Sequence, residues 1–553
     1  MLHKSQIVRN NILLYGLIGG IITVTSGLLV ILYPTLLRTV IKSQMQITED
    51  ENAVTKTWMD VPLPMYFSVY LFTIDNPRQF IRGAKAKIRE MGPYVYKKHQ
   101  WKEIISWSPD HESVKYWSKS SYTFDIERTV GSRNDQIIIV NVPIYVLAAI
   151  IKGLIDKLPL STLTAPAAFR IINRLFMNHS ERIVKRLTVG QLIEGYRLSI
   201  LDTIDTVVKP LKLLGINIPD FGMPNNRFGI LNGKNNSKSG PYEVLTGQGD
   251  TQFLKVISYE NKRRFNYYDK RKCNMFNGTD GSNMGSFLHK EDTLYVFNAA
   301  ACRSIYATYS GVSHVNGIPS WRYVLPANLF GSPQKNPDNR CYCRTPHIPD
   351  ACDGIFYVGQ CLSGAPLALS YPHLMYASRR LTQTIDGLHP NRELHESYFD
   401  IEPTLGTPMK GAARLQMNLL MQPIDLLDDF KYIREAVIPF VWFEESTQIE
   451  GNFIWLMRLA VYSMMTIEYG SVISFCLGLL VLCFTIGYTF KHWKYLTPGT
   501  SDDQSNKENK HKFADNLRDY YGTQTTPIAD IRAKDAVNFK LQRMHFSPPG
   551  SID

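Results

Sequence analysis

Two long apolar stretches without a charged residue lie near the ends of the chain. They are residues 12–33 and 469–490, each 22 residues long. A helix needs about 20 apolar residues to cross the hydrocarbon core of a bilayer. A cleavable signal peptide would have a shorter apolar region and a small-residue cleavage site, whereas Pro34 follows the first stretch. Buried core helices are the alternative, but this length predicts two membrane-spanning helices, the first an uncleaved signal anchor.

Two spans place both termini on one side of the membrane and leave residues 34–468 between them. Lys491 and Lys494 follow the second span, and cytoplasmic flanks are enriched in Lys and Arg. The first span has basic residues on both sides and does not decide the orientation. We therefore expect residues 1–11 and the polar tail 491–553 in the cytoplasm, and residues 34–468 as the ectodomain.

Within the ectodomain, the spacing of apolar residues changes twice. Residues 62–142 hold short alternating stretches, which predict antiparallel strands with one buried face. The expected strands are 67–74, 94–98, 122–126 and 136–142, with turns at Asn76-Pro77, Gly92-Pro93 and Gly131-Ser132. From about 143 to 215, apolar residues recur every three or four positions, which predicts about three inserted helices, at 144–158, 167–176 and 191–208. Short strands and turns return after residue 215.

Cysteines and aromatic residues narrow the class of protein. The 553 residues include 8 Trp, 30 Tyr and 26 Phe, which excludes a disordered chain. Two of the eight cysteines lie in the second span, and six fall in one window of the ectodomain: Cys273, Cys302, Cys341, Cys343, Cys352 and Cys361. An even number of crowded cysteines indicates disulfides in an oxidising compartment, with 15 possible pairings. A zinc site is the alternative, but the usual C-x2-4-C pairs are missing.

Three N-glycosylation sequons begin at Asn178, Asn235 and Asn277, all between the two spans. Glycosylation of Asn-X-Ser/Thr takes place outside the cytosol. Together with the cysteines, the sequons predict that residues 34–468 are extracellular or luminal.

Positive charge is concentrated in and around the helical insert. Lys and Arg exceed Asp and Glu by 12 in the chain, and residues 152–272 alone hold 20 basic and 10 acidic residues. The residues of interest are Arg170, Arg174, Arg182, Lys185 and Arg186. We expect them to form a surface that recruits anionic ligands, with an ordinary solvated face as the alternative. A nucleic-acid partner is not expected on this side of the membrane.

Motifs for catalysis are missing from the sequence. It has no His-Glu-x-x-His, no Gly-x-Ser-x-Gly and no phosphate-binding loop. We therefore expect neither an enzyme nor a cofactor. In the first span, Gly16-x-x-x-Gly20 would let another helix approach closely, either the second span or a second copy of the chain, so a homo-oligomer stays open.

A series of short motifs, taken in order, resembles the class B scavenger receptor family, which includes the fatty-acid translocase and the lysosomal integral membrane protein. The resemblance covers about residues 12–495. The motifs are 72–77 (FTIDNP), 90–96 (EMGPYVY), 277–280 (NGTD), 302–306 (CRSIY), 365–366 (AP), 370–374 (SYPHL), 400–403 (DIEP), 414–420 (RLQMNLL) and 438–439 (IP).

This resemblance implies an α+β membrane protein. Its ectodomain would be an irregular antiparallel β-barrel with a lipid tunnel and a membrane-distal helical bundle. The implied disulfides are Cys273–Cys341, Cys302–Cys361 and Cys343–Cys352. In some members a lysine of the apex helices contacts fatty-acid carboxylates, but that position falls on or near Asn178, so we transfer no ligand contact.

The expected function is a cell-surface receptor that captures lipid-bearing or anionic particles and transfers hydrophobic cargo to the membrane through the tunnel. Such a path avoids water, where each exposed CH2 costs about 0.8 kcal/mol. The alternative is a lysosomal or adhesion-type membrane protein that binds a protein partner through its helical apex. Residues 547–553 contain no acidic dileucine signal, which favours the plasma membrane over the lysosomal membrane.

Overall fold

The computed structural model describes residues 2–156, 161–203, 223–250, 252–344 and 351–493. Most of the predicted tail, and residues 204–208 of the third expected helix, lie outside these ranges. Contacts divide the chain into two units, residues 1–25 with 474–553, and residues 26–473.

Both predicted spans are helices, and both are longer than their uncharged stretches. They are α1 (Leu2–Gln44) and α11 (Asn452–Lys491), each apolar and long enough to cross a membrane. In the first unit, a Cβ atom added to Gly19 would lie 3.0 Å from Val481 Cγ1. Gly16 and Gly20 have no described neighbour within 4 Å in that direction. Gly19 is therefore a glycine of α1 that lets α11 approach, because the missing side chain leaves room for it.

The larger unit is built on a sheet that is almost closed into a barrel. Eleven strands follow one another across it: β10 (Leu294–Asn298), β11 (Arg303–Val315), β12 (Ile318–Val324), β16 (Tyr398–Glu402), β17 (Thr407–Met421), β18 (Ala436–Gln448), β1 (Met65–Ile74), β2 (Ala86–Trp107), β3 (Ser113–Phe124), β8 (Ser237–Leu245) and β9 (Val256–Tyr259). All neighbours on this path are antiparallel. Thr279 forms bridges to both Lys255, beside β9, and Val296 of β10, so it links the two edges.

Smaller elements cover the barrel. Strands β13 (Phe356–Tyr357) and β14 (Leu367–Ser370) extend from β17, and β15 (Ile385–Asp386) pairs with β2. Other short helices and strands include α2 (Ala53–Met59), α3 (Pro77–Phe80), β7 (Arg227–Phe228), α9 (Arg379–Thr382) and α10 (Arg392–His395).

The turn predicted at Gly92-Pro93 is wrong, because β2 runs through it for 22 residues. The register with β1 shifts there, from Val69 opposite Tyr94 to Leu71 opposite Met91. Extra residues in one strand make a β-bulge, which bends the strand without ending it. Gly92 has φ +130°, and a Cβ at this position would lie 2.8 Å from Val69 O. The same glycine that suggested a turn therefore permits the bulge.

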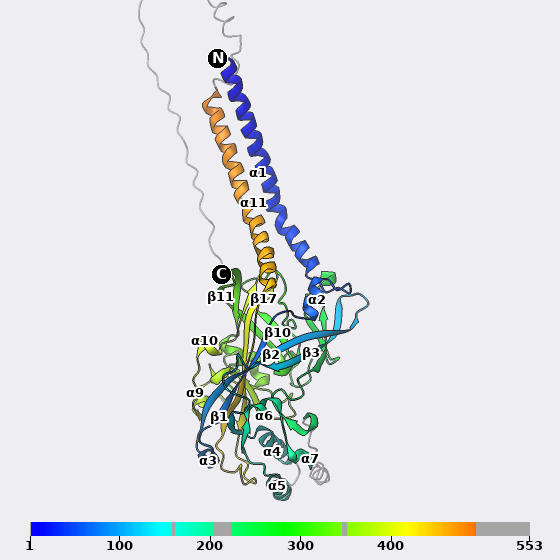
Figure 1. Cartoon of the computed structure of the whole chain (residues 1–553), viewed down its shortest axis with the longest axis vertical. Coiled ribbons are helices and arrows are strands. Elements are labelled where there is room, and N and C mark those ends of the chain that lie inside the picture. Colours follow the sequence, from blue (N-terminus) through cyan, green and yellow to red (C-terminus); the bar gives the residue numbers. More distant parts are fainter. Residues whose placement is uncertain (1, 157–160, 204–222, 251, 345–350, 494–553) are drawn as a thin grey trace, which may run out of the picture. The chain divides into compact units, whose positions relative to one another are not determined.

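The helical insert is less regular than predicted. Its elements are β4 (Gln136–Val140), α4 (Val142–Ile155), α5 (Ser161–Asn178), β5 (Val184–Thr188), α6 (Val189–Glu194), β6 (Tyr196–Arg197) and α7 (Ser199–Asp202). The third expected helix, 191–208, is wrong as one element, because the chain leaves the helix at Gly195, where φ is +119°. Figure 1 shows α4, α5 and α7 together at the opposite end of the 26–473 unit from the first turns of α11.

The insert shares its hydrophobic core with the barrel. Helix α4 is buried on almost every side, as expected for a helix that is apolar all round. The Tyr145 hydroxyl accepts from Gln422 N at 2.6 Å, just after β17. One continuous cluster contains residues of α4, α5, β1 and β18. The insert is thus part of the barrel's fold and not a separate domain.

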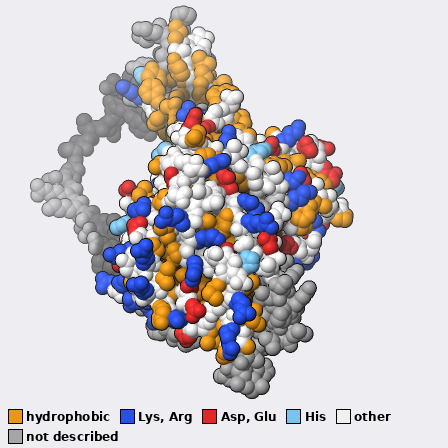
Figure 2. Space-filling model, turned by 60° about the horizontal axis from the view of Figure 1, so that its bottom comes forward, with side chains coloured by type: hydrophobic (Ala, Val, Ile, Leu, Met, Phe, Trp, Pro, Cys, Tyr) orange, Lys and Arg blue, Asp and Glu red, His pale blue; other side chains and the backbone are white. Residues whose placement is uncertain are grey.

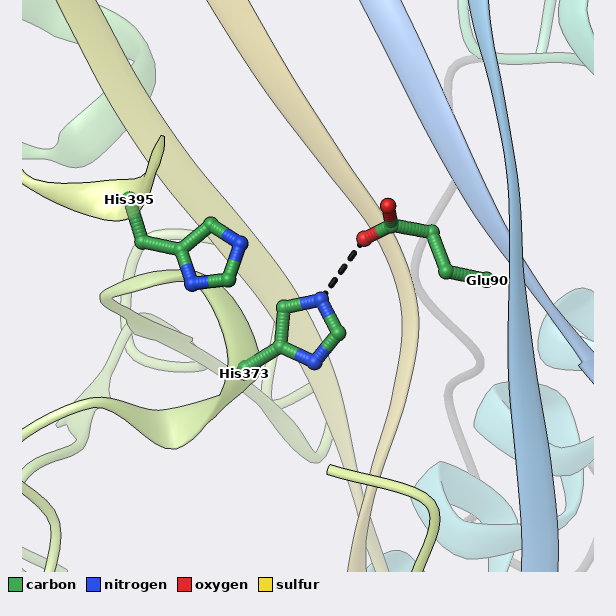
Figure 3. A group of neighbouring side chains, drawn as sticks. All are labelled: Glu90, His373 and His395. Atoms are coloured by element: carbon green, nitrogen blue, oxygen red, sulfur yellow. Dashed lines mark hydrogen bonds and ion pairs between the residues drawn. The ribbon is translucent and has the colours of Figure 1, made fainter. Parts of the chain in front are cut away.

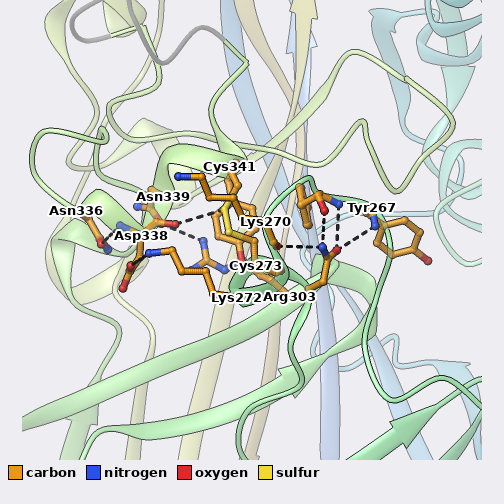
Figure 4. Close-up of a disulfide and its surroundings, with 12 residues drawn as sticks. Tyr267, Lys270, Lys272, Cys273, Arg303, Asn336, Asp338, Asn339 and Cys341 are labelled. Atoms are coloured by element: carbon orange, nitrogen blue, oxygen red, sulfur yellow. Dashed lines mark hydrogen bonds and ion pairs between the residues drawn. A yellow bond between two sulfur atoms is a disulfide. The ribbon is translucent and has the colours of Figure 1, made fainter.

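Three disulfides join the loops on one side of the barrel. Cys273 is bonded to Cys341, Cys302 to Cys361, and Cys343 to Cys352, which are the pairs that the resemblance implies. Figure 4 shows the first of them beside Arg303, whose guanidinium donates to Asn339 Oδ1 at 3.3 Å. In the structure, all six cysteines between the two spans are thus paired with one another.

Candidate functional site

The interior of the barrel contains a mostly apolar cavity of about 230 Å³. Strands β1, β10, β11, β12, β16, β17 and β18 all contribute to its wall. Its apolar lining includes Met65, Met284, Leu294, Val296, Ile305, Ala307, Tyr323, Leu325, Phe399, Ile401, Pro408, Ala413 and Leu415. Sites of this composition hold apolar ligands and orient them with a few polar groups.

The alternation of side chains along β18 decides which groups face the cavity. Glu445 lies opposite Ala413 of β17 and Phe67 of β1, and Ala413 lines the cavity. Glu444 lies opposite Arg414, and Arg414 Nε donates to Glu444 Oε2 at 2.7 Å. Arg414 is among the residues that line the cavity, whereas Glu444 is not. Successive residues of a strand point to opposite sides of the sheet. Glu445 therefore points inward and Glu444 outward.

Inside the barrel, Glu445 forms an ion pair with Lys98 of β2. Lys98 Nζ lies 2.5 Å from Glu445 Oε1, and their side chains are 9% and 40% exposed. Burial lowers the pKa of Lys98, but Glu445 and Tyr122 together raise it more, so the pKa lies above its ordinary value. Lys98 is therefore charged, and it lies behind Glu445, whose carboxylate lines the cavity.

A second, more open space adjoins the cavity. This groove of about 800 Å³ shares the side chains of Met284 and Leu294 with the cavity. Lys42 and Met45 at the end of α1 also line it. Met284 and Leu294 thus line both the cavity and the groove. The groove extends from these residues to the end of α1.

Glu90, His373 and His395 form a compact cluster outside the cavity, with ligand-type atoms within 4.8 Å of one another (Figure 3). His373 Nε2 donates to Glu90 Oε2 at 2.7 Å. Nδ1 of each histidine accepts a backbone N–H, from His389 at 3.1 Å and from Asn391 at 3.0 Å. A neutral histidine that binds a metal through Nε2 carries its proton on Nδ1, where these amides already donate. The cluster therefore does not fit a metal ion.

Burial shifts the pKa values of two groups in this cluster. Burial and the neighbouring His373 lower the pKa of His395 to about 4. Burial raises the pKa of Glu90, but hydrogen bonds from His373 and from Trp442 Nε1 outweigh it, so the pKa lies below its ordinary value. At neutral pH the cluster thus holds a neutral His395 and an ionised Glu90.

The five predicted recruiting residues lie in two different environments. Arg170 and Arg174 on α5 and Arg186 on β5 are exposed. The other two form ion pairs, Arg182 with Asp429 at 3.0 Å and Lys185 with the buried Glu181 at 2.9 Å. Figure 2 shows Lys and Arg side chains scattered among apolar ones over this end of the molecule, with fewer acidic side chains.

All three sequon asparagines are exposed. Asn178 ends α5, Asn235 precedes β8, and Asn277 lines the groove. Exposure is what attachment of a glycan requires.

Comparison with protein-family models matches residues 17–489 to the CD36 family. The chain belongs to the CD36 family. It is 30% identical to scavenger receptor class B member 1 of Bos taurus over 481 residues, 86% of this chain and 89% of the relative. It is 29% identical to lysosome membrane protein 2 of Homo sapiens over 454 residues, 81% of this chain and 88% of the relative.

Membership of the CD36 family supports a receptor role for this membrane protein with two candidate spans. The resemblance stated from the sequence motifs is confirmed. Sequence reasoning missed the Lys98–Glu445 pair, because its partners are 347 residues apart. Glu444-Glu445, which follow the apolar first half of β18, were a visible signal, but the sequence does not show which carboxylate points inward.

Proposed function

We propose that this CD36-family protein is a cell-surface receptor that captures lipid-bearing or anionic particles and transfers apolar cargo to the membrane. The observation that carries the proposal is the apolar cavity inside the barrel, which shares Met284 and Leu294 with the groove at the end of α1. A lipid that moves along these surfaces stays out of water, which saves about 0.8 kcal/mol for each CH2 group.

The proposed topology follows from the two terminal helices. Both tails lie in the cytoplasm, and residues 34–468 form a glycosylated ectodomain at the cell surface. The basic residues of α5 and β5 attract anionic particles from solution, and the barrel then receives the cargo. Scavenger receptor class B member 1, a relative over 86% of the chain, supports this function.

Blocking the cavity tests the proposal. Ala413 lines the cavity and is replaced in Ala413→Trp, while Ala84→Trp adds the same bulk at an exposed loop position. The two full-length variants and the parent are purified, and their retained lipids are measured by mass spectrometry. We expect retained lipid and cellular uptake to fall several-fold for Ala413→Trp alone. Equal lipid content and uptake in all three properly displayed proteins would overturn the proposal.

A second candidate function is the binding of a protein partner at the helical end. Ile171 and Met177 of α5 and the nearby Leu426 are 37%, 61% and 43% exposed. Asn173 Nδ2 donates to Leu426 O at 2.9 Å, so these apolar side chains belong to one surface region. A lysosomal location goes with this candidate, and the relative named lysosome membrane protein 2 supports it. Changing Leu426 and Met177 to Ser, with lipid uptake and localisation as readouts, separates the two functions.

A further inference from the structure

Glu445 is the acidic residue among those that line the cavity, and only one of its two carboxylate oxygens accepts a hydrogen bond from a described residue. Glu445 Oε1 accepts from Lys98, while Oε2 has no hydrogen-bond partner among the residues that the structure describes. Glu445 and Arg414 are the charged residues that line the cavity, and Lys98 is not among them. The guanidinium of Arg414 is already bound, because its Nε donates to Glu444 Oε2 and its Nη1 to Glu396 O. A molecule in the cavity therefore meets a carboxylate oxygen first and the ammonium group only behind it.

A free acceptor in a largely apolar cavity favours a ligand that donates a hydrogen bond. A hydroxyl group does so without bringing a charge into the barrel. A carboxylate cargo would place two negative groups together, which is unfavourable in a medium of low dielectric constant. An ester head group offers only acceptors and leaves the Glu445 oxygen unpaired.

We infer that Glu445 selects the cargo by its head group, and that the cavity prefers a long-chain lipid alcohol to the corresponding fatty-acid anion. The inference rests on the proposed function, because it concerns cargo in the same cavity. Lys98 is a positioning residue, since it fixes the carboxylate and compensates its charge from behind. The next residue, Glu444, has the same charge and also binds a basic residue, but on the outer face.

The experiment compares three probes that differ only in the head group: dodecanol, dodecanoate and methyl dodecanoate. Each is titrated at neutral pH into the full-length protein in neutral phosphatidylcholine nanodiscs, in competition with a fluorescent lipid. We expect the parent to bind dodecanol at least about tenfold more tightly than dodecanoate, with the ester in between.

Glu445→Gln removes the negative charge and leaves the ammonium of Lys98 without a counter-ion. We expect this variant to bind dodecanoate more tightly than dodecanol, because the anion now pairs with Lys98. Glu444→Gln is the matched control and should keep the preference of the parent. Should Glu445→Gln fold poorly, Lys98→Met/Glu445→Leu removes both charges, and its affinities for the three probes should lie within about threefold of one another.

Two results overturn the inference. One is equal affinity of the parent for dodecanol and dodecanoate, and the other is the same shift in preference for Glu444→Gln and Glu445→Gln. If the probes bind equally but Ala413→Trp prevents their binding, the cavity still holds lipid and only the selection by Glu445 is wrong. The proposed function itself fails if no probe binds the parent, or if the probes bind and Ala413→Trp leaves their binding unchanged.

Discussion

The barrel and the helical apex, residues 142–202, carry their charges in different ways. Lys98 in the barrel is 9% exposed and lies against Glu445, whereas Arg170, Arg174 and Arg186 at the apex are exposed and have no ion-pair partner among the described residues. Two charges at 4 Å interact with about 1 kcal/mol in water, and several times more in a protein environment.

In the proposed function, the two regions serve different steps. Exposed charges attract ligands through solvent, and salt screens them beyond about 8 Å at physiological ionic strength. Buried pairs contribute to the integrity of the fold and to the chemistry of the cavity, because separating them leaves an uncompensated charge. Changes in the barrel should therefore affect stability and cargo, and changes at the apex should affect association.

The largest effect is expected from the disulfides beside the barrel. Replacing Cys302 and Cys361 by Ala removes a cross-link over 59 residues and should lower the free energy of unfolding by roughly 2–5 kcal/mol. Thermal denaturation and the amount of protein at the cell surface measure the loss. Peptide mapping without reductant should find the same three pairs, and free thiols at Cys341 and Cys343 would contradict them.

Breaking one ion pair in each region gives a direct comparison. Lys98→Met leaves Glu445 unpaired and should lower the free energy of unfolding by about 1–3 kcal/mol, less than for a fully buried pair because the Glu445 side chain is 40% exposed. Arg182→Gln breaks the exposed pair with Asp429 and should change it by less than about 1 kcal/mol. Denaturation of both variants measures the difference. Equal losses would show that burial does not distinguish the two regions.

Acid should destabilise the protein through His395 of α10. Its pKa is about 4 when folded and about 6.5 in an unfolded chain. Between these values the unfolded state binds the proton and the folded state does not, so stability falls as the pH drops from 6.5 towards 4. The loss reaches about 2 kcal/mol near pH 5. His395→Gln should reduce this slope, and identical melting-temperature profiles from pH 7 to 4.5 would refute the assignment.

The smallest effect on stability is expected at the apex. Changing Arg170, Arg174 and Arg186 to Gln should leave the melting temperature almost unchanged, yet slow the capture of anionic lipid particles several-fold at low salt. Changing Arg182 to Gln should affect capture less, because Asp429 already neutralises it. Unchanged capture by the first variant would make these residues an ordinary solvated face.

Glycine marks positions of unusual backbone conformation in this sequence, but it does not show whether the position is a turn, a β-bulge or the end of a helix. Gly92-Pro93 predicted a turn and lies in a bulge of a long strand, whereas Gly195 was not used as a signal and ends a helix. Both glycines have positive φ. Which structure follows depends on whether a neighbouring strand continues past the glycine, and that neighbour is distant in the sequence.

The sequence by itself determined the two terminal apolar helices and the antiparallel strands of the region between them, and it predicted disulfides among six cysteines of that region. These depend on local apolar runs, alternation and residue type, which act over a few neighbouring positions. The tertiary structure alone decided that Glu445 faces the cavity, that Glu444 does not, and that Lys98 compensates the inner carboxylate. The reason is the strand register, because a shift of one residue would exchange the two faces.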